Sequence, residues 1–175
     1  AEIEDTETLV ADLGRNADVL MLHPGEDGLS RIAGAIRARD GVDALHIVSH
    51  GASGEVILAG DTITTAVLRE RRTTVADWVA DEILVYGCET AQGGKGSSFV
   101  ETMSPITGAS VAASQDKVGQ GRWNLTTADG QEPVAALAFS ESVQTTYSGT
   151  FANVTFEVSS PFWVESPASA ITFRF

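Results

Sequence analysis

Two short apolar runs, each ending at a glycine beside a reactive side chain, most constrain what this chain can fold into. Residues 44–49 and 82–87 are rich in the aliphatic residues that fill fully buried strands. His50 and Gly51 follow the first run, and Cys88, the one cysteine in 175 residues, follows the second. In an open parallel sheet, chemistry collects at the carboxyl ends of the strands. Two neighbouring strands of this kind would bring an imidazole and a thiol to one edge.

The order of apolar patterns predicts an α/β fold. Further buried strands are expected at residues 18–22 and 109–113, and helical patterns separate the four strands. Connections of this length favour parallel pairing, so we predict one mostly parallel central sheet flanked by helices, a three-layer sandwich. From residue 151 the pattern becomes alternating and aromatic. We expect an α/β domain over residues 1–150 and a C-terminal β extension over 151–175, packed outside the core as a tail or as the start of a following domain.

Two local predictions concern the chain after the fourth strand. Residues 122–125 resemble a short strand, and residues 134–147 resemble a helix.

Composition excludes several classes of function. The formal net charge is −13 and the isoelectric point is about 4.4, which argues against nucleic acid and anionic membrane surfaces as partners. No stretch approaches 18 apolar residues, so we expect no membrane span. No signal peptide follows Ala1, and we expect any export signal to have been removed or to lie outside this sequence. The three histidines and one cysteine lack metal-ligand spacing, so we expect neither a metal nor another cofactor.

A cysteine nucleophile needs a base or a positive field to become a thiolate at neutral pH, and His50 can supply either. The backbone N–H groups of Gly51 and Cys88 could stabilise an oxyanion. A catalytic Cys88 is expected to be partly exposed, with a thiol pKa below its ordinary value. The alternative is that Cys88 is a small buried hydrophobe and His50 a core histidine.

Four ordered motifs carry a family resemblance: LHIVSHG at 45–51, ILVYGC at 83–88, TGASVAAS at 107–114 and GRWNL at 121–125. Over about residues 3–151 the chain resembles an uncharacterised caspase-like domain found near the N-terminus of giant, repeat-rich bacterial surface proteins. It is more distantly similar to the caspase, gingipain and legumain group of cysteine peptidases. That resemblance implies the fold, a His50/Cys88 dyad, and secretion or display on a bacterial cell surface. His23 departs from the family pattern, which favours an acidic residue there, and the sequence leaves open whether His23 joins the site.

The resemblance implies a cysteine peptidase acting on a peptide or protein, with its own chain as one candidate substrate. A substrate pocket beside the cysteine could include Asp116, which would select a basic residue, although Asp116 also fits a solvated turn. Glu89 or Asp27 could orient His50. The alternative function is a non-catalytic structural or interaction module of a surface assembly, in which the 151–175 tail docks on a partner by strand addition.

Overall fold

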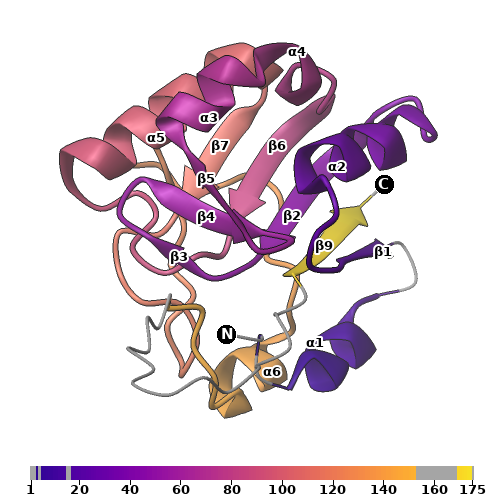
Figure 1. Ribbon diagram of the computed structural model, residues 1–175. Helices are drawn as coiled ribbons and strands as arrows, with labels where there is room; N and C mark the ends of the chain where they lie inside the picture. The colour runs from indigo at the N-terminus through magenta and orange to yellow at the C-terminus, as the bar shows by residue number, and fades with distance from the viewer. Residues whose placement is uncertain (1–2, 4, 15–16, 153–168, 175) are drawn as a thin grey trace, which may run out of the picture.

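The computed structural model describes residues 3, 5–14, 17–152 and 169–174 (Figure 1). The helices are α1 (Thr6–Asp12), α2 (Gly28–Arg37), α3 (Thr65–Glu70), α4 (Arg72–Val75), α5 (Gly93–Thr107) and α6 (Glu141–Thr146). The strands are β1 (Ala17–Leu22), β2 (Val42–Val48), β3 (Gly51–Ala52), β4 (Glu55–Leu58), β5 (Asp61–Thr64), β6 (Ala80–Val85), β7 (Ser110–Ala113), β8 (Thr126–Thr127) and β9 (Ser169–Arg174).

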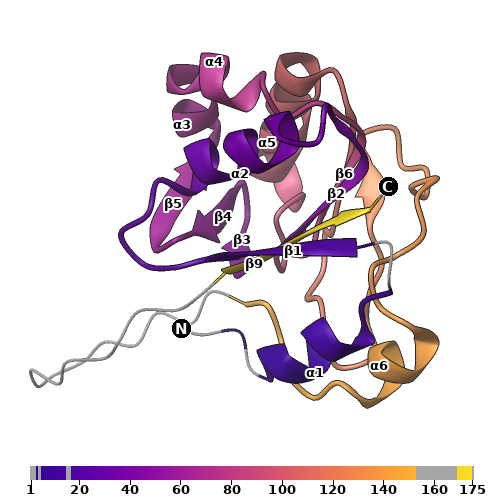
Figure 2. The same cartoon turned by 90° about the vertical axis from the view of Figure 1, so that its right-hand side faces the viewer.

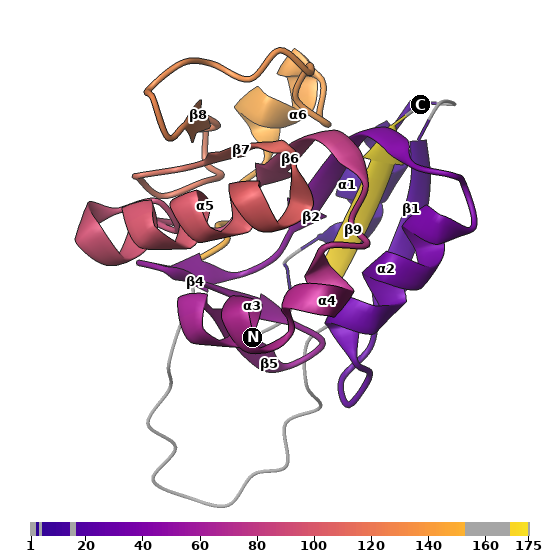
Figure 3. The same cartoon turned by 90° about the horizontal axis from the view of Figure 1, so that it is seen from above.

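The central sheet has the strand order β1-β9-β2-β6-β7-β8, which can be followed in Figure 3. Strand β6 pairs in parallel with both β2 and β7. Strand β9 is antiparallel to β1 and to β2, so β1 points in the same direction as β2. The four strands predicted from the apolar runs therefore share one direction in one mostly parallel sheet, and the predicted fold class is confirmed.

Helices cover both faces of this sheet. Helices α2, α3, α4 and α5 lie on one face, and α1 and α6 lie on the other (Figure 2). Successive residues of a strand point to opposite faces, so Ile83 packs under α2–α5 while Leu84 packs on the α1/α6 side. Cys88 packs with Leu84 in the apolar cluster on the α1/α6 side, which also contains Tyr86 and Trp123. The Cys88 side chain is therefore on the face that α1 and α6 cover.

Strand β9, in the C-terminal tail, lies inside the central sheet. Strand β9 pairs with β1 along one side and with β2 along the other, from Ser169 to Arg174. The prediction that the tail packs outside the α/β core is wrong for this strand. A local pattern shows that a segment is β, but it does not show which distant strands that segment will join. Residues 153–168, also part of the predicted tail, lie outside the described residues.

The chain between β7 and the tail has little regular structure. The helix predicted over residues 134–147 is confined to Glu141–Thr146. Side chains bind the backbone amides before it: the Glu82 carboxylate accepts from the N–H groups of Val134 and Ala135, and the Tyr86 hydroxyl accepts from Ala138. In a helix these amides would donate to backbone carbonyls, but here side-chain oxygens accept from them. These tertiary hydrogen bonds override the helical pattern of the sequence. The strand predicted at 122–125 is likewise absent, and β8 begins directly after it.

None of the described helices has the length and apolar character needed to cross a bilayer.

Candidate active site

The site is built where the chain leaves β2 and β6. These parallel strands pair up to Ile47 and Val85, and each then runs to a glycine. Gly51 and Gly87 approach so closely that a Cβ on Gly51 would lie 2.9 Å from the Gly87 Cα atom. The Thr90 hydroxyl, which donates to the Gly87 carbonyl at 3.1 Å, would lie 2.5 Å from a Cβ on either glycine. Glycine at both positions therefore allows the two turns to meet.

Two backbone amides from these turns converge on one oxygen. The N–H of Gly51 donates to the carbonyl oxygen of Phe151 at 3.0 Å, and the N–H of Cys88 donates to the same oxygen at 3.2 Å. These are the two amides that the sequence nominated as oxyanion donors. A pair of fixed N–H groups aimed at one carbonyl oxygen is the arrangement that stabilises the oxyanion in acyl transfer.

The segment that supplies this carbonyl lies across the strand ends as an extended peptide. Phe151 donates its N–H to the carbonyl of Val118 at 3.2 Å, and Thr150 forms an antiparallel bridge with Gly119. On its other side, Ala152 forms a parallel bridge with Gly51. The segment 150–152 is therefore held between the 118–119 backbone and the His50–Gly51 turn by main-chain contacts, as a peptide substrate is held by strand addition.

Cys88 is completely buried beneath this segment. Its Sγ atom accepts a hydrogen bond from the Val118 N–H at 3.0 Å and lies 3.5 Å from the Val118 carbonyl oxygen, to which the thiol donates. Burial raises the pKa of the Cys88 thiol, and hydrogen bonds from the backbone at Val118 and Phe151 oppose that rise only in part. The expectation of a partly exposed thiol with a lowered pKa is therefore wrong for this conformation, because residues 118 and 151 cover the sulfur.

His50 lies at the edge of the same turn and is 7% exposed. Neither ring nitrogen has a hydrogen-bond partner, so the His50 ring and the Cys88 thiol are not hydrogen-bonded to each other. Neither proposed orienting carboxylate binds the ring. The Asp27 carboxylate instead caps α2 and lies 2.6 Å from the Arg71 guanidinium. Glu89 lies in the turn after Cys88, where its backbone is left-handed with φ of 57°. A buried imidazole with both nitrogens unsatisfied is uncommon, and a catalytic role is one of the explanations for it.

Aromatic rings surround the Phe151 side chain. The Phe151 ring is fully buried, with its centroid 5.7 Å from that of Trp123 and 5.6 Å from that of Tyr147. The Tyr147 ring is stacked on it, and the Trp123 ring meets it edge-on. Trp123 is held in turn by a hydrogen bond from its indole N–H to the Gln144 carbonyl at 2.8 Å. The residue whose carbonyl meets the two amides thus has its side chain in an apolar aromatic pocket.

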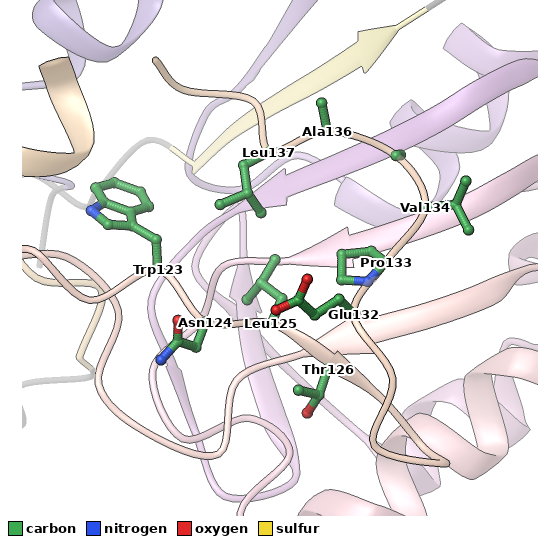
Figure 4. Close-up of a pocket in the computed structure, with 10 residues that line it drawn as sticks. Trp123, Asn124, Leu125, Thr126, Glu132, Pro133, Val134, Ala136 and Leu137 are labelled. Atoms are coloured by element: carbon green, nitrogen blue, oxygen red, sulfur yellow. The ribbon is translucent and has the colours of Figure 1, made fainter. Parts of the chain in front are cut away.

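A cavity of about 530 Å³ is lined in part by Trp123 (Figure 4). It is formed by two facing segments, 123–126 and 132–137, and Trp123 and Leu137 lie together at one end. Neither His50 nor Cys88 lines it. It shares only Trp123 with the site, so its size alone does not make it the place where chemistry occurs.

Two other nominated residues lie at the margin. The Asp116 side chain is exposed, and its backbone carbonyl accepts the Glu89 N–H at 2.8 Å. His23 is exposed at the end of β1, and β9 separates that strand from β2 and His50. Among the residues that the structure describes, no group of three histidine, cysteine or acidic side chains could hold a metal ion.

Sequence reasoning missed the residues that complete the site. The Val118 N–H donates to the Cys88 sulfur, and the Phe151 carbonyl accepts from the Gly51 and Cys88 amides. Both residues nevertheless have the apolar side chains of ordinary core residues. Only their main-chain groups take part, and backbone hydrogen bonding between distant loops leaves no pattern in a single sequence. Thr90 had one usable signal: it is a polar residue three positions after Gly87 in a turn that is otherwise tightly packed.

Comparison with known families assigns the chain to one family. The family model described as a domain of unknown function, DUF4347, matches residues 1–151, and the chain belongs to that family. No curated protein and no solved structure matches the chain. The family description names no activity. The match ends at Phe151, the residue whose carbonyl oxygen accepts from the Gly51 and Cys88 amides.

Proposed function

We propose that this DUF4347 domain is a caspase-like cysteine peptidase, with Cys88 as nucleophile and His50 as general base. One observation carries the proposal: the amides of Gly51 and Cys88 donate to a single peptide carbonyl. That arrangement holds a carbonyl oxygen beside the residue that bears the thiol. In acyl transfer, each such donor is worth roughly 10²–10³ in rate.

The remaining roles follow from position. His50 comes directly before one oxyanion donor, and its unpartnered ring nitrogens leave it free to accept the thiol proton. The raised pKa of Cys88 means that the covered thiol is protonated at neutral pH, so the proton must move to His50 as the sulfur attacks. The extended backbone at Val118 and Gly119 binds the substrate main chain.

The expected setting is a secreted or surface protein of a bacterium. The resemblance to domains of giant surface proteins supports it, and a formal charge of −13 is compatible with an extracellular surface. The substrate is a peptide or protein in extended conformation, since main-chain pairing is what the site offers.

A second function is favoured by the sulfur contacts. The Val118 N–H bonds to Sγ at 3.0 Å and the thiol is fully buried, as for a cysteine that only packs. In that case the domain is a non-catalytic module of a surface assembly, and its partner does not bind by strand addition to β9, because β1 and β2 already pair with both sides of that strand.

The two functions are separated by a peptidase assay on four proteins. The wild-type chain is incubated with a library of fluorogenic peptides, beside Cys88→Ala, His50→Ala and the matched control His23→Ala. We expect hydrolysis by the wild type and by His23→Ala, because His23 is exposed and β9 separates its strand from β2. Both site variants should lose activity by roughly 10³-fold or more. Equal rates in all four proteins would show that the hydrolysis does not depend on His50 and Cys88 and would overturn the proposal. No hydrolysis by any of them would support the structural module instead.

A further inference from the structure

We infer that the substrate of this site is the chain itself, and that the bond it cuts is Phe151–Ala152. This inference rests on the proposed function and specifies its substrate. Only one described residue offers its carbonyl to both Gly51 and Cys88, and that residue is Phe151. The bond cleaved by acyl transfer is the one that follows the carbonyl held by the oxyanion donors, which here joins Phe151 to Ala152.

The register of the neighbouring residues agrees with this assignment. Val118 contacts both reactants: its carbonyl accepts the Phe151 N–H at 3.2 Å, and its N–H donates to the Cys88 Sγ at 3.0 Å. One residue thus fixes the sulfur and the amide of the residue to be attacked. The bridge from Thr150 to Gly119 fixes the preceding residue, and the bridge from Ala152 to Gly51 fixes the following one. Backbone contacts therefore hold the bond on both of its sides.

The side chain before the bond sets the specificity. The Phe151 ring is fully buried against Trp123 and Tyr147, and that pocket contains no charged side chain among the described ring contacts. An aromatic or large aliphatic residue fits it, while a basic residue would bury an unpaired ammonium. Asp116, nominated from the sequence as the selector of a basic residue, is exposed and makes no described contact with Phe151.

The reaction balances with water as the only co-reactant. His50 takes the thiol proton, and Sγ forms a bond to the Phe151 carbonyl carbon while Gly51 and Cys88 stabilise the oxyanion. The bond to the Ala152 nitrogen breaks, and that nitrogen receives the proton from His50 to leave as an amine. Water, with His50 as base, then hydrolyses the thioester. The products are a carboxylate at Phe151, a free amine at Ala152 and the regenerated thiol.

The position of β9 determines what happens after the cut. Strand β9 lies downstream of Ala152 and is hydrogen-bonded between β1 and β2. The released segment therefore stays bound through the central sheet. Cutting opens the site while the two fragments remain one particle under native conditions.

The test follows the intact mass of the purified full chain over time at neutral pH, measured after denaturation. We expect two fragments, one ending at Phe151 and one beginning at Ala152, formed at a rate that does not depend on protein concentration. Cys88→Ala and His50→Ala should stay intact, and Cys88→Ala mixed with wild type should also stay intact because the cut is intramolecular. The control His23→Ala should be cut like the wild type.

Specificity is tested at the residue before the bond. Phe151→Leu should be cut within about tenfold of the wild-type rate, and Phe151→Lys should be slower by about 100-fold or more. Each substitution is also made in the Cys88→Ala background, where no cut occurs, so that its effect on folding is measured separately. Should Phe151→Lys fail to fold, peptides of sequence 147–153 with Phe, Leu or Lys at position 151 give the same comparison.

The outcomes distinguish this inference from the proposed function. A wild-type chain that stays intact, yet hydrolyses added peptides through Cys88 and His50, overturns self-cleavage and leaves the peptidase standing. Cutting at another bond, or equal cutting of the Leu and Lys variants, also overturns the assignment to Phe151. A chain that neither cuts itself nor hydrolyses any peptide overturns both.

Discussion

Gly51 and Gly87 lie against each other at the ends of neighbouring strands, with no room for a side chain between them. A Cβ on Gly51 would be 2.9 Å from the Gly87 Cα atom, and one on Gly87 would be 3.1 Å from the Gly51 Cα atom. This contact places the Gly51 and Cys88 amides close enough to share one acceptor. The packing of two glycines thus determines the geometry of the candidate oxyanion site.

Gly51→Ala is therefore predicted to lower both stability and activity. The added methyl group would meet the Thr90 hydroxyl and the Gly87 backbone, and overpacking of this kind costs about 1–3 kcal/mol. Urea unfolding measures the loss. The matched control is Gly34→Ala in helix α2, where a Cβ meets nothing within 4 Å, and its stability should stay equal or rise by about 0.5–1 kcal/mol. Similar losses in both variants would contradict the close contact.

Asp27→Ala is predicted to destabilise the chain at neutral pH but much less in acid. Burial alone would raise the Asp27 pKa, but hydrogen bonds from Arg71 and Ser30 outweigh it and lower the pKa. The carboxylate caps α2, and losing such a cap costs about 1 kcal/mol. Because the folded-state pKa is the lower one, this stability is present above about pH 4 and is lost as the pH falls through the folded value.

The measurement is urea unfolding of wild type and Asp27→Ala at neutral pH and near pH 3. The control is Asp43→Ala, an exposed residue on β2, which should differ little from wild type at either pH. If the free energies of unfolding of wild type and Asp27→Ala differ by the same amount at both pH values, the ionised Asp27 carboxylate does not stabilise the folded chain in this way.

Cys88 is predicted to make stability fall at alkaline pH. Burial raises its pKa, so the folded chain keeps the thiol proton after the unfolded chain has released it. The stability that the protonated thiol contributes is complete below about pH 8.5, the pKa of an unfolded cysteine. It is lost as the pH rises through the thiol pKa of the folded chain, at up to about 1.4 kcal/mol per pH unit. The free energies of unfolding of wild type and Cys88→Ala should converge above pH 8.5. Parallel curves would show that the buried thiol does not titrate with folding.

The framework of the fold could be predicted from sequence because each part of it has a local signature. The four parallel strands are apolar runs bounded by glycine or polar residues, and their shared direction followed from the helical connections between them. Strand β9 was recognised as β but not as a member of the central sheet. Its partners are β1 and β2, far away in the chain, and that choice is made by backbone pairing.

The candidate site divides in the same way. His50 and Cys88 could be nominated because reactive side chains beside glycine at strand ends are visible in the sequence. The cover over Cys88 could not be foreseen, because it consists of the main chain of Val118 and Phe151. Exposure of the thiol is the expectation for a catalytic cysteine, whereas a segment from elsewhere in the chain covers this one.

The activation of Cys88 by His50 can be measured as the rate of Cys88 alkylation by iodoacetamide as a function of pH. The Phe151 segment covers the sulfur, so the reaction requires that segment to lift or to be cut, but it does not require the whole domain to unfold. We expect alkylation near neutral pH to be faster than global unfolding. The alkylation rate should decrease clearly in His50→Ala but not in His23→Ala. Alkylation that follows the unfolding rate and is unchanged in His50→Ala would contradict it.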